Sequence, residues 1–83
     1  MNAPDAALAP ADREVDARGL NCPLPILRTK KALNDMESRQ TIRVLATDPA
    51  SVRDFQAFSR QTGNQLVGHG ERDGAFWFLL KRR

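Results

Sequence analysis

Residues 16–25 read Asp-Ala-Arg-Gly-Leu-Asn-Cys-Pro-Leu-Pro, and they place prolines one and three positions after the chain's only cysteine. Pro23 fits the first position of a helix, because its fixed φ is already helical and its missing N–H would have no partner there. Pro25 falls in the same first turn, where no intrahelical donor is lost. The run therefore predicts a short loop and then a helix that begins next to Cys22.

Cys22 is expected to react rather than to fill space. The free N–H groups and the positive end of a helix dipole favour a thiolate, so the pattern predicts a pKa below the ~8.5 of a free thiol. A lone cysteine is more often a small buried hydrophobe. However, Ser or Asp would cap a helix better than Cys. The arrangement therefore favours a nucleophile or a group carrier.

Hydrophobic periodicity divides the rest of the chain into alternating strands and helices. The expected strands cover 14–18, 40–47, 65–71 and 75–82, and the expected helices run from about Pro23 to Met36 and from Pro49 to a stop at Gly63. Asp73-Gly74 is typical of a hairpin turn. Right-handed crossovers place both helices on one face. The prediction is an α/β (α+β) two-layer sandwich with βαβαββ order, a four-stranded mixed sheet, and Trp77 or its neighbours on the open sheet face.

Length and charge set further limits. The 83 residues predict one domain over 13–83 after a disordered tail over 1–12, which has little to bury. Residues 1–16 hold four acidic residues and one basic residue, whereas the remainder holds 12 basic and six acidic residues, a net charge of +6. One cysteine excludes an intramolecular disulfide and, with one histidine, offers too few ligands for zinc, so no metal is expected. No apolar run reaches ~18 residues and no secretory signal is evident, so a cytoplasmic protein is expected.

The run from Asp16 to Pro25 resembles the signature of the TusA/SirA family of small sulfur-carrier proteins. A second similarity is Thr47-Asp48-Pro49, which resembles the family's acidic strand end before its second helix. The resemblance covers about residues 13–83. It implies that the second strand lies between the first and the fourth, and that sulfur is carried as a transient persulfide on Cys22 without another cofactor. Many members have Gly-His where this chain has Gly63-Asn64, which removes any role for a histidine there.

The resemblance also implies a carrier that acts with partners and not a stand-alone enzyme. A cysteine desulfurase or a rhodanese would supply the sulfur, and an acceptor sulfurtransferase protein would take it. The pathway stays open between tRNA thiolation, molybdenum-cofactor supply and sulfur oxidation. The sequence shows no acid or base beside the thiol, so turnover needs those partners. The supporting roles expected are loop orientation for Asp16, a tight turn or close backbone approach for Gly19, stiffening for Pro23 and Pro25, and a helix cap rather than catalysis for Asp48.

Leu24 and Leu27 fall opposite the expected core face of the first helix. That core face comprises Pro25, Ile26, Thr29, Ala32, Leu33 and Met36. Arg28 and Lys31 lie on the same side as the two leucines, which predicts a docking patch with an apolar centre and a basic rim. The alternative is that Leu27 packs under a loop as part of the core. The protein is expected to be a monomer.

Two other classes of function stay open. The net charge of +6 permits a nucleic-acid-binding regulatory module, although direct binding is not expected because no basic patch is interleaved with aromatic residues. A single reactive cysteine also permits a thiol redox sensor, although the chain holds no second cysteine to resolve an oxidised sulfur.

Overall fold

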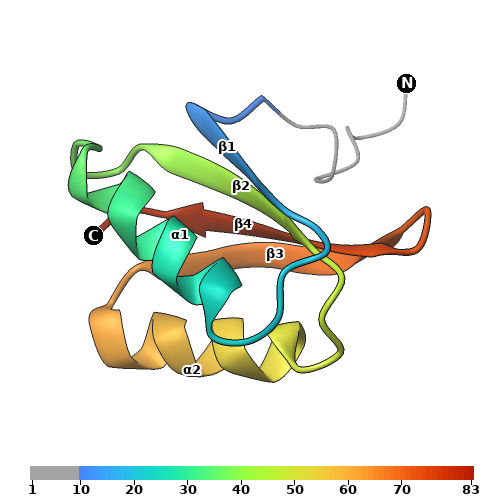
Figure 1. Ribbon diagram of the computed structural model, residues 1–83. Coiled ribbons are helices and arrows are strands. Elements are labelled where there is room, and N and C mark those ends of the chain that lie inside the picture. Colours follow the sequence, from blue (N-terminus) through green and yellow to red (C-terminus); the bar gives the residue numbers. More distant parts are fainter. Residues whose placement is uncertain (1–9) are drawn as a thin grey trace.

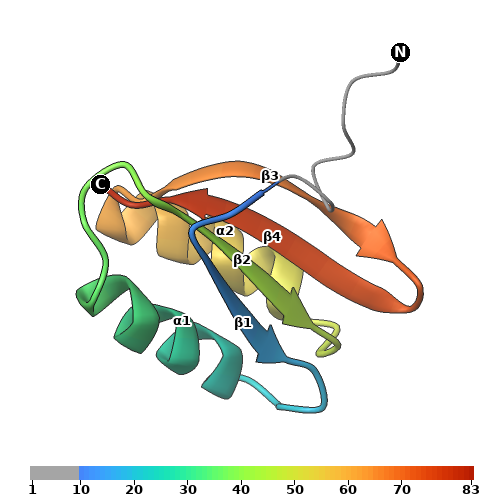
Figure 2. The ribbon, with the colours of Figure 1, turned by 90° about the horizontal axis from the view of Figure 1, so that it is seen from above.

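Four strands form one sheet, and two helices cover one face of it. The computed structural model describes residues 10–83. Its elements are β1 (Arg13–Ala17), α1 (Leu24–Asn34), β2 (Thr41–Ala46), α2 (Ser51–Thr62), β3 (Gln65–Arg72) and β4 (Ala75–Lys81). Figures 1 and 2 show both helices on one side of the sheet. The two-layer βαβαββ fold predicted from the sequence is confirmed.

The order of the strands fixes where the loops meet. The sheet runs β1-β2-β4-β3, as the family resemblance implies. β1 is parallel to β2, with Ala17 opposite Ala46, and the other pairs are antiparallel. Parallel neighbours have their carboxyl ends at the same edge of the sheet. The loop that carries Cys22 and the loop that carries Asp48 therefore leave the sheet side by side.

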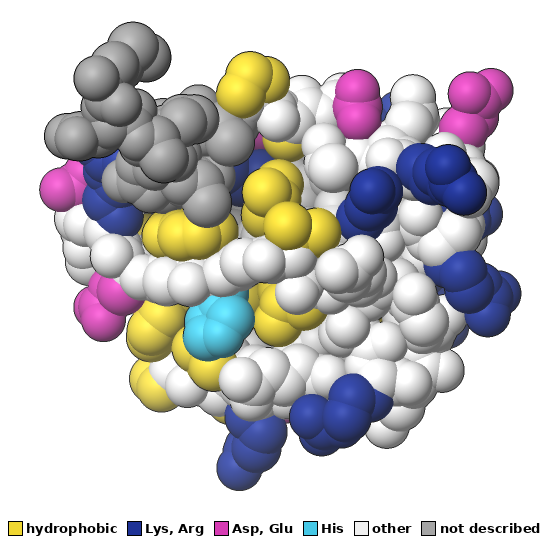
Figure 3. Space-filling model, turned by 180° about the vertical axis from the view of Figure 1, so that it is seen from behind, with side chains coloured by type: hydrophobic (Ala, Val, Ile, Leu, Met, Phe, Trp, Pro, Cys, Tyr) yellow, Lys and Arg dark blue, Asp and Glu magenta, His cyan; other side chains and the backbone are white. Residues whose placement is uncertain are grey.

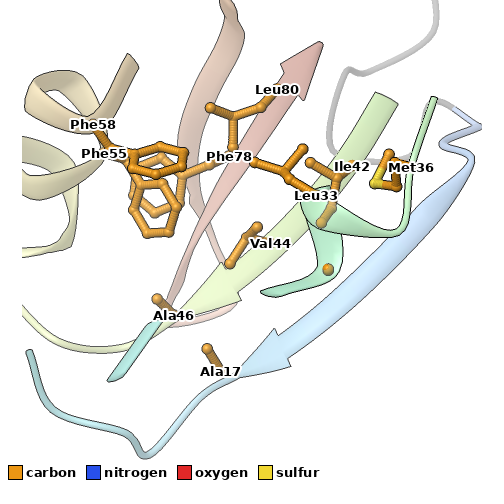
Figure 4. Close-up of a cluster of buried hydrophobic side chains, with 11 residues drawn as sticks. Ala17, Leu33, Met36, Ile42, Val44, Ala46, Phe55, Phe58, Phe78 and Leu80 are labelled. Atoms are coloured by element: carbon orange, nitrogen blue, oxygen red, sulfur yellow. The ribbon is translucent and has the colours of Figure 1, made fainter. Parts of the chain in front are cut away.

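The core lies between the sheet and the helices (Figure 4). Phe55 of α2 stacks on Phe78 of β4, with ring centroids 4.4 Å apart. On α1, the predicted core face is buried at Pro25, Thr29, Ala32, Leu33 and, just after the helix, Met36. Ile26 is only half-buried. The core thus fixes α1 and α2 on the sheet and leaves the Ile26 side of α1 facing the space between the helices.

The ends of the helices differ in part from the prediction. Pro23 is the N-cap residue, not the first helical residue, and α1 ends at Asn34 instead of Met36. α2 begins at Ser51 instead of Pro49, because a turn closed by the Ser51 N–H on the Asp48 carbonyl (3.0 Å) comes first. The predicted stop at Gly63 is confirmed by its left-handed φ of 79°.

The hairpin and the open sheet face also follow the sequence pattern. β3 and β4 are joined at Asp73 (φ 53°) and Gly74 (φ 80°), the conformation that Asp-Gly favours in two-residue hairpins. Trp77 is half-buried and lies so close to Gly70 that a Cβ there would come within 2.9 Å of the indole nitrogen. Figure 3 shows hydrophobic side chains at the surface on the side seen from behind.

The proposed tail lies mostly outside the described residues, which begin at Pro10. Within it, Asp12 contacts β2: its carboxylate accepts the Thr41 N–H at 2.8 Å, and its own N–H donates to the Thr41 hydroxyl at 3.3 Å. Asp12 is therefore joined to the sheet. No helix in the described part of the chain is long and apolar enough to cross a membrane.

Candidate functional site

Cys22 lies in the loop between β1 and α1, directly before the N-cap residue Pro23. Its side chain is exposed and forms no disulfide. The loop turns into the helix through a hydrogen bond from the Leu24 N–H to the Asn21 carbonyl, at 2.8 Å, and the Cys22–Pro23 peptide bond is cis. The sulfur is thus open to a reaction partner at the start of α1.

Two hydrogen bonds tie this loop to the neighbouring one. The Gly19 N–H donates to the Thr47 hydroxyl at 2.8 Å, and the Cys22 N–H donates to the Asp48 carboxylate at 2.6 Å. The second Asp48 oxygen accepts the Ala50 N–H at 3.1 Å. Asp48 was expected to cap α2, but Ala50 is the N-cap residue. Asp48 instead fixes the backbone of the cysteine to the segment that leads into α2.

Gly19 and Asp16 shape the loop from the other end. Gly19 has a φ of 80°, and a Cβ built on it would meet nothing within 4 Å. Its role is therefore the turn itself and not a close backbone approach. The Asp16 carboxylate accepts hydrogen bonds from the Arg18 side chain (2.8 Å) and backbone N–H (3.1 Å), which lower the pKa of Asp16 to about 2. Asp16 thus pairs with Arg18 and stays ionised at neutral pH, which agrees with an orienting role and offers no proton donor.

A groove of about 240 Å³ runs between α1 and α2, with Cys22 in its lining. Ile26 of α1 and Ala57 and Phe58 of α2 make it largely apolar, and Asp54 lies on the α2 side. The sequence did not reveal this groove, because its walls come from two helices whose relative position depends on the packed core. The half-burial of Ile26 is explained by this position on the groove.

Asp54 is a residue of this site that sequence reasoning missed. A ligand atom of each of Cys22, Asp48 and Asp54 lies within 4.8 Å of the other two, so the Asp54 carboxylate lies beside the Cys22 thiol. The interaction with Asp54, desolvation and the charge of Asp48 raise the pKa of Cys22, whereas the charge of Arg53 lowers it. The predicted low pKa is therefore wrong in direction, because two carboxylates oppose the helix dipole. The strand pairing could have revealed Asp54. Because β1 and β2 are parallel neighbours, the loops that follow them lie side by side, and the acidic first turn of α2 lies near Cys22.

The three atoms of Cys22, Asp48 and Asp54 are also the closest approach to a metal site in the described chain. A structural zinc site takes four protein ligands. Cys22, Asp48 and Asp54 offer three, and this is the group found among residues 10–83. Both Asp48 oxygens already accept backbone hydrogen bonds. We interpret the group as the electrostatic surroundings of the thiol, and the expectation that the protein holds no metal stays a prediction.

The expected docking residues lie on the outer side of α1. Leu24 and Leu27 are 46% and 52% exposed, so Leu27 does not pack under a loop as core. Arg28 and Lys31 are exposed and line a shallow depression against β1. The structure thus places the leucines at the surface within two turns of Cys22, on a different side of α1 from Ile26 and the groove. Their contact with a partner stays a prediction.

Comparison with known proteins places this site in a family. Residues 13–82 match the family model described as Sulfurtransferase TusA. A sulfur carrier protein TusA of Allochromatium vinosum is 59% identical over 75 residues, which cover 90% of this chain and 99% of that protein. A putative sulfur carrier protein of Neisseria meningitidis is 48% identical over 69 residues, which cover 83% and 93% of the two chains.

A solved structure agrees with the sequence matches. The crystal structure of a SirA-like protein from Desulfitobacterium hafniense superposes with a TM-score of 0.75 at 30% identity, and the match covers 83% of this chain and 95% of that one. The family match and these relatives extend over the strands, the helices and the Cys22 loop together. The chain therefore belongs to the TusA family of sulfur carriers.

Proposed function

We propose that this protein carries sulfur as a persulfide on Cys22, between a donor protein and an acceptor protein. The observation that supports this most directly is the position of the chain's only thiol. It is exposed, it lines an apolar groove, and hydrogen bonds to Thr47 and Asp48 fix the loop around it. A thiol presented in this way can meet the cysteine of another protein.

The transfer chemistry needs partners. Each step is the attack of a sulfur nucleophile on a sulfane sulfur, and its rate depends on thiolate fraction and access. The raised pKa of Cys22 leaves little thiolate at neutral pH, so a partner site has to activate or supply the nucleophile. A cysteine desulfurase or a rhodanese fits the donor role, and a sulfurtransferase fits the acceptor role. We propose no stand-alone turnover, a cytoplasmic location, and a destination in tRNA thiolation, molybdenum-cofactor supply or sulfur oxidation.

The same pKa argues against the redox-sensor alternative. Sensor cysteines are accessible and have a low pKa, commonly beside a resolving cysteine. Cys22 is accessible, but its pKa is raised and the sequence holds no second cysteine.

Intact mass after treatment with inorganic polysulfide tests the proposal. We expect a gain of one sulfur atom (~32 Da) that dithiothreitol reverses. The Cys22→Ser variant should fold normally and gain nothing. An adduct retained on the Ser variant, or a gain of oxygen instead of sulfur on the wild type, would contradict the proposal.

A further inference from the structure

Three charged side chains act on the sulfur of Cys22. Asp48 acts on it from the loop after β2, and Asp54 and Arg53 act from α2. On the α1 side, the groove residues Pro23 and Ile26 carry no titratable group. Cys22 therefore faces two negative charges and one positive charge, and an oxygen of each of Asp48 and Asp54 lies within 4.8 Å of its sulfur.

Loading with sulfur would bring a further negative charge to this position. A donor persulfide anion gives up its terminal sulfur: a bond forms between that sulfur and Sγ of Cys22, and the S–S bond of the donor breaks. The thiol proton of Cys22 passes to the leaving sulfur of the donor, and the products are a Cys22 persulfide anion and a donor thiol. One S–S bond replaces another, so no oxidant or reductant is consumed. Because a persulfide is a stronger acid than its parent thiol, the loaded form keeps its charge at neutral pH.

We propose that Asp54, supported by Asp48, biases Cys22 toward releasing its sulfur, an inference that rests on the carrier function proposed above. In the empty protein a neutral thiol lies beside Asp54 and Asp48. In the loaded protein that proton is gone and an anion faces two carboxylates, which disfavour it. An acceptor thiol that attacks the terminal sulfur restores the neutral thiol and leaves with the charge as its own persulfide anion.

Two neighbouring residues, Asp54 and Arg53, allow substitutions that change the charge near Cys22 in opposite directions. Asp54→Asn removes a negative charge and keeps the size of the side chain, whereas Arg53→Gln removes the positive charge that favours the anion. Asp73 serves as a matched control, because it is an exposed carboxylate in the β3–β4 hairpin, outside the group around Cys22. Its φ of 53° is one that Asn adopts readily.

The test is the exchange equilibrium with glutathione and glutathione persulfide at neutral pH, in EDTA so that no metal takes part. Intact mass gives the ratio of loaded to empty Cys22. We expect Asp54→Asn to raise that ratio about three- to tenfold, as the loss of a nearby like charge implies. Arg53→Gln should lower the ratio, and Asp73→Asn should leave it unchanged.

The pH profile of alkylation with iodoacetamide distinguishes an electrostatic effect of Asp54 on the thiol from a merely structural role. Asp54→Asn should shift the profile to lower pH, and the shift should shrink at about 1 M salt, where the screening length is about 3 Å. Equal ratios and equal profiles for Asp54→Asn and wild type would overturn the proposal, as would shifts of the same sign in Asp54→Asn and Arg53→Gln. If no variant takes up sulfur, the carrier function fails instead, while the alkylation profile still tests the effect of Asp54 on the thiol.

Discussion

Asp48 connects the reactive loop to the second helix through its two carboxylate oxygens. One oxygen accepts the Cys22 N–H and the other accepts the Ala50 N–H. A single side chain thus sets where the sulfur stands relative to α2, and with it the contact between Cys22 and Asp54. Gly19, through its bond to Thr47, adds a second connection between the same two loops.

Replacement of Asp48 tests this connection. Asp48→Ala leaves both N–H groups without their acceptor, so we expect the free energy of unfolding to fall by about 1–2 kcal/mol in urea titrations, with slower sulfur loading. Asp48→Asn is the control, because its one carbonyl oxygen can keep one of the two hydrogen bonds and should limit the loss. An Asp48→Ala protein as stable as wild type would show that the two loops do not depend on this residue.

The Asp16–Arg18 pair predicts a pH effect of definite sign. The pKa of Asp16 is lowered to about 2 by hydrogen bonds from Arg18, below its ordinary 3.8. A lowered pKa in the folded state adds stability above the unfolded pKa, and this contribution is lost as pH falls from about 4 to about 2. Arg18→Gln should raise the Asp16 pKa toward its ordinary value, measured by NMR titration of the carboxyl carbon. An Asp16 pKa that stays at about 2 in Arg18→Gln would mean that another group holds the carboxylate.

Helix α1 presents chemically different surfaces on its different sides. One buries Leu33 against the sheet, a second turns Ile26 toward the groove, and a third exposes Leu24 and Leu27. The periodicity of the sequence was enough to predict the core side and the exposed leucines, because both follow from helical geometry alone. The groove and the Asp54 contact could not be predicted in this way, because they depend on how α2 sits beside α1.

Substitutions on the two sides of α1 should separate stability from docking. Leu33→Ala empties a buried site, where Leu33 is 4% exposed, and should cost about 2–5 kcal/mol. Leu27→Ala should change the free energy of unfolding by no more than about 0.5 kcal/mol, because Leu27 is at the surface.

The docking surface is tested by charge substitutions on the same side of α1. Leu27→Glu should fold and be alkylated like wild type but exchange sulfur more slowly with a partner protein, and Arg28→Glu should make that exchange less responsive to salt. Normal exchange in Leu27→Glu would place the docking surface elsewhere, with the α1–α2 groove as the next candidate.

The order of the strands was implied by the family resemblance. The individual strands and turns follow from features that the sequence makes visible: apolar periodicity, a Gly63 stop and an Asp-Gly hairpin. The direction of the pKa shift of Cys22 does not follow from such features. It comes from carboxylates that the parallel pairing of β1 with β2 brings to the cysteine. Local geometry at a helix start therefore gave the place of the thiol correctly and its acidity incorrectly. The boundary of the tail was also beyond local patterns, since Asp12 is joined to Thr41 on another strand.

The edge of the folded domain is tested by shortening the chain. A protein that begins at Pro10 should keep the thermal midpoint of the full chain, because residues 1–9 hold only two large apolar side chains, Met1 and Leu8. One that begins at Arg13 loses the hydrogen bonds between Asp12 and Thr41, and its midpoint should be lower by about 4–8 °C. Equal midpoints for the two shortened proteins would show that the Asp12 contact adds nothing to stability.

Sulfur delivery through Cys22 is tested most directly with radioactive sulfur. A cysteine desulfurase supplied with [³⁵S]cysteine should label the wild-type protein, and an acceptor thiol should remove that label without a reductant. Cys22→Ser should stay unlabelled under the same conditions. Label on the Ser variant, or wild-type protein that stays unlabelled beside an active desulfurase, would contradict a persulfide carried on Cys22.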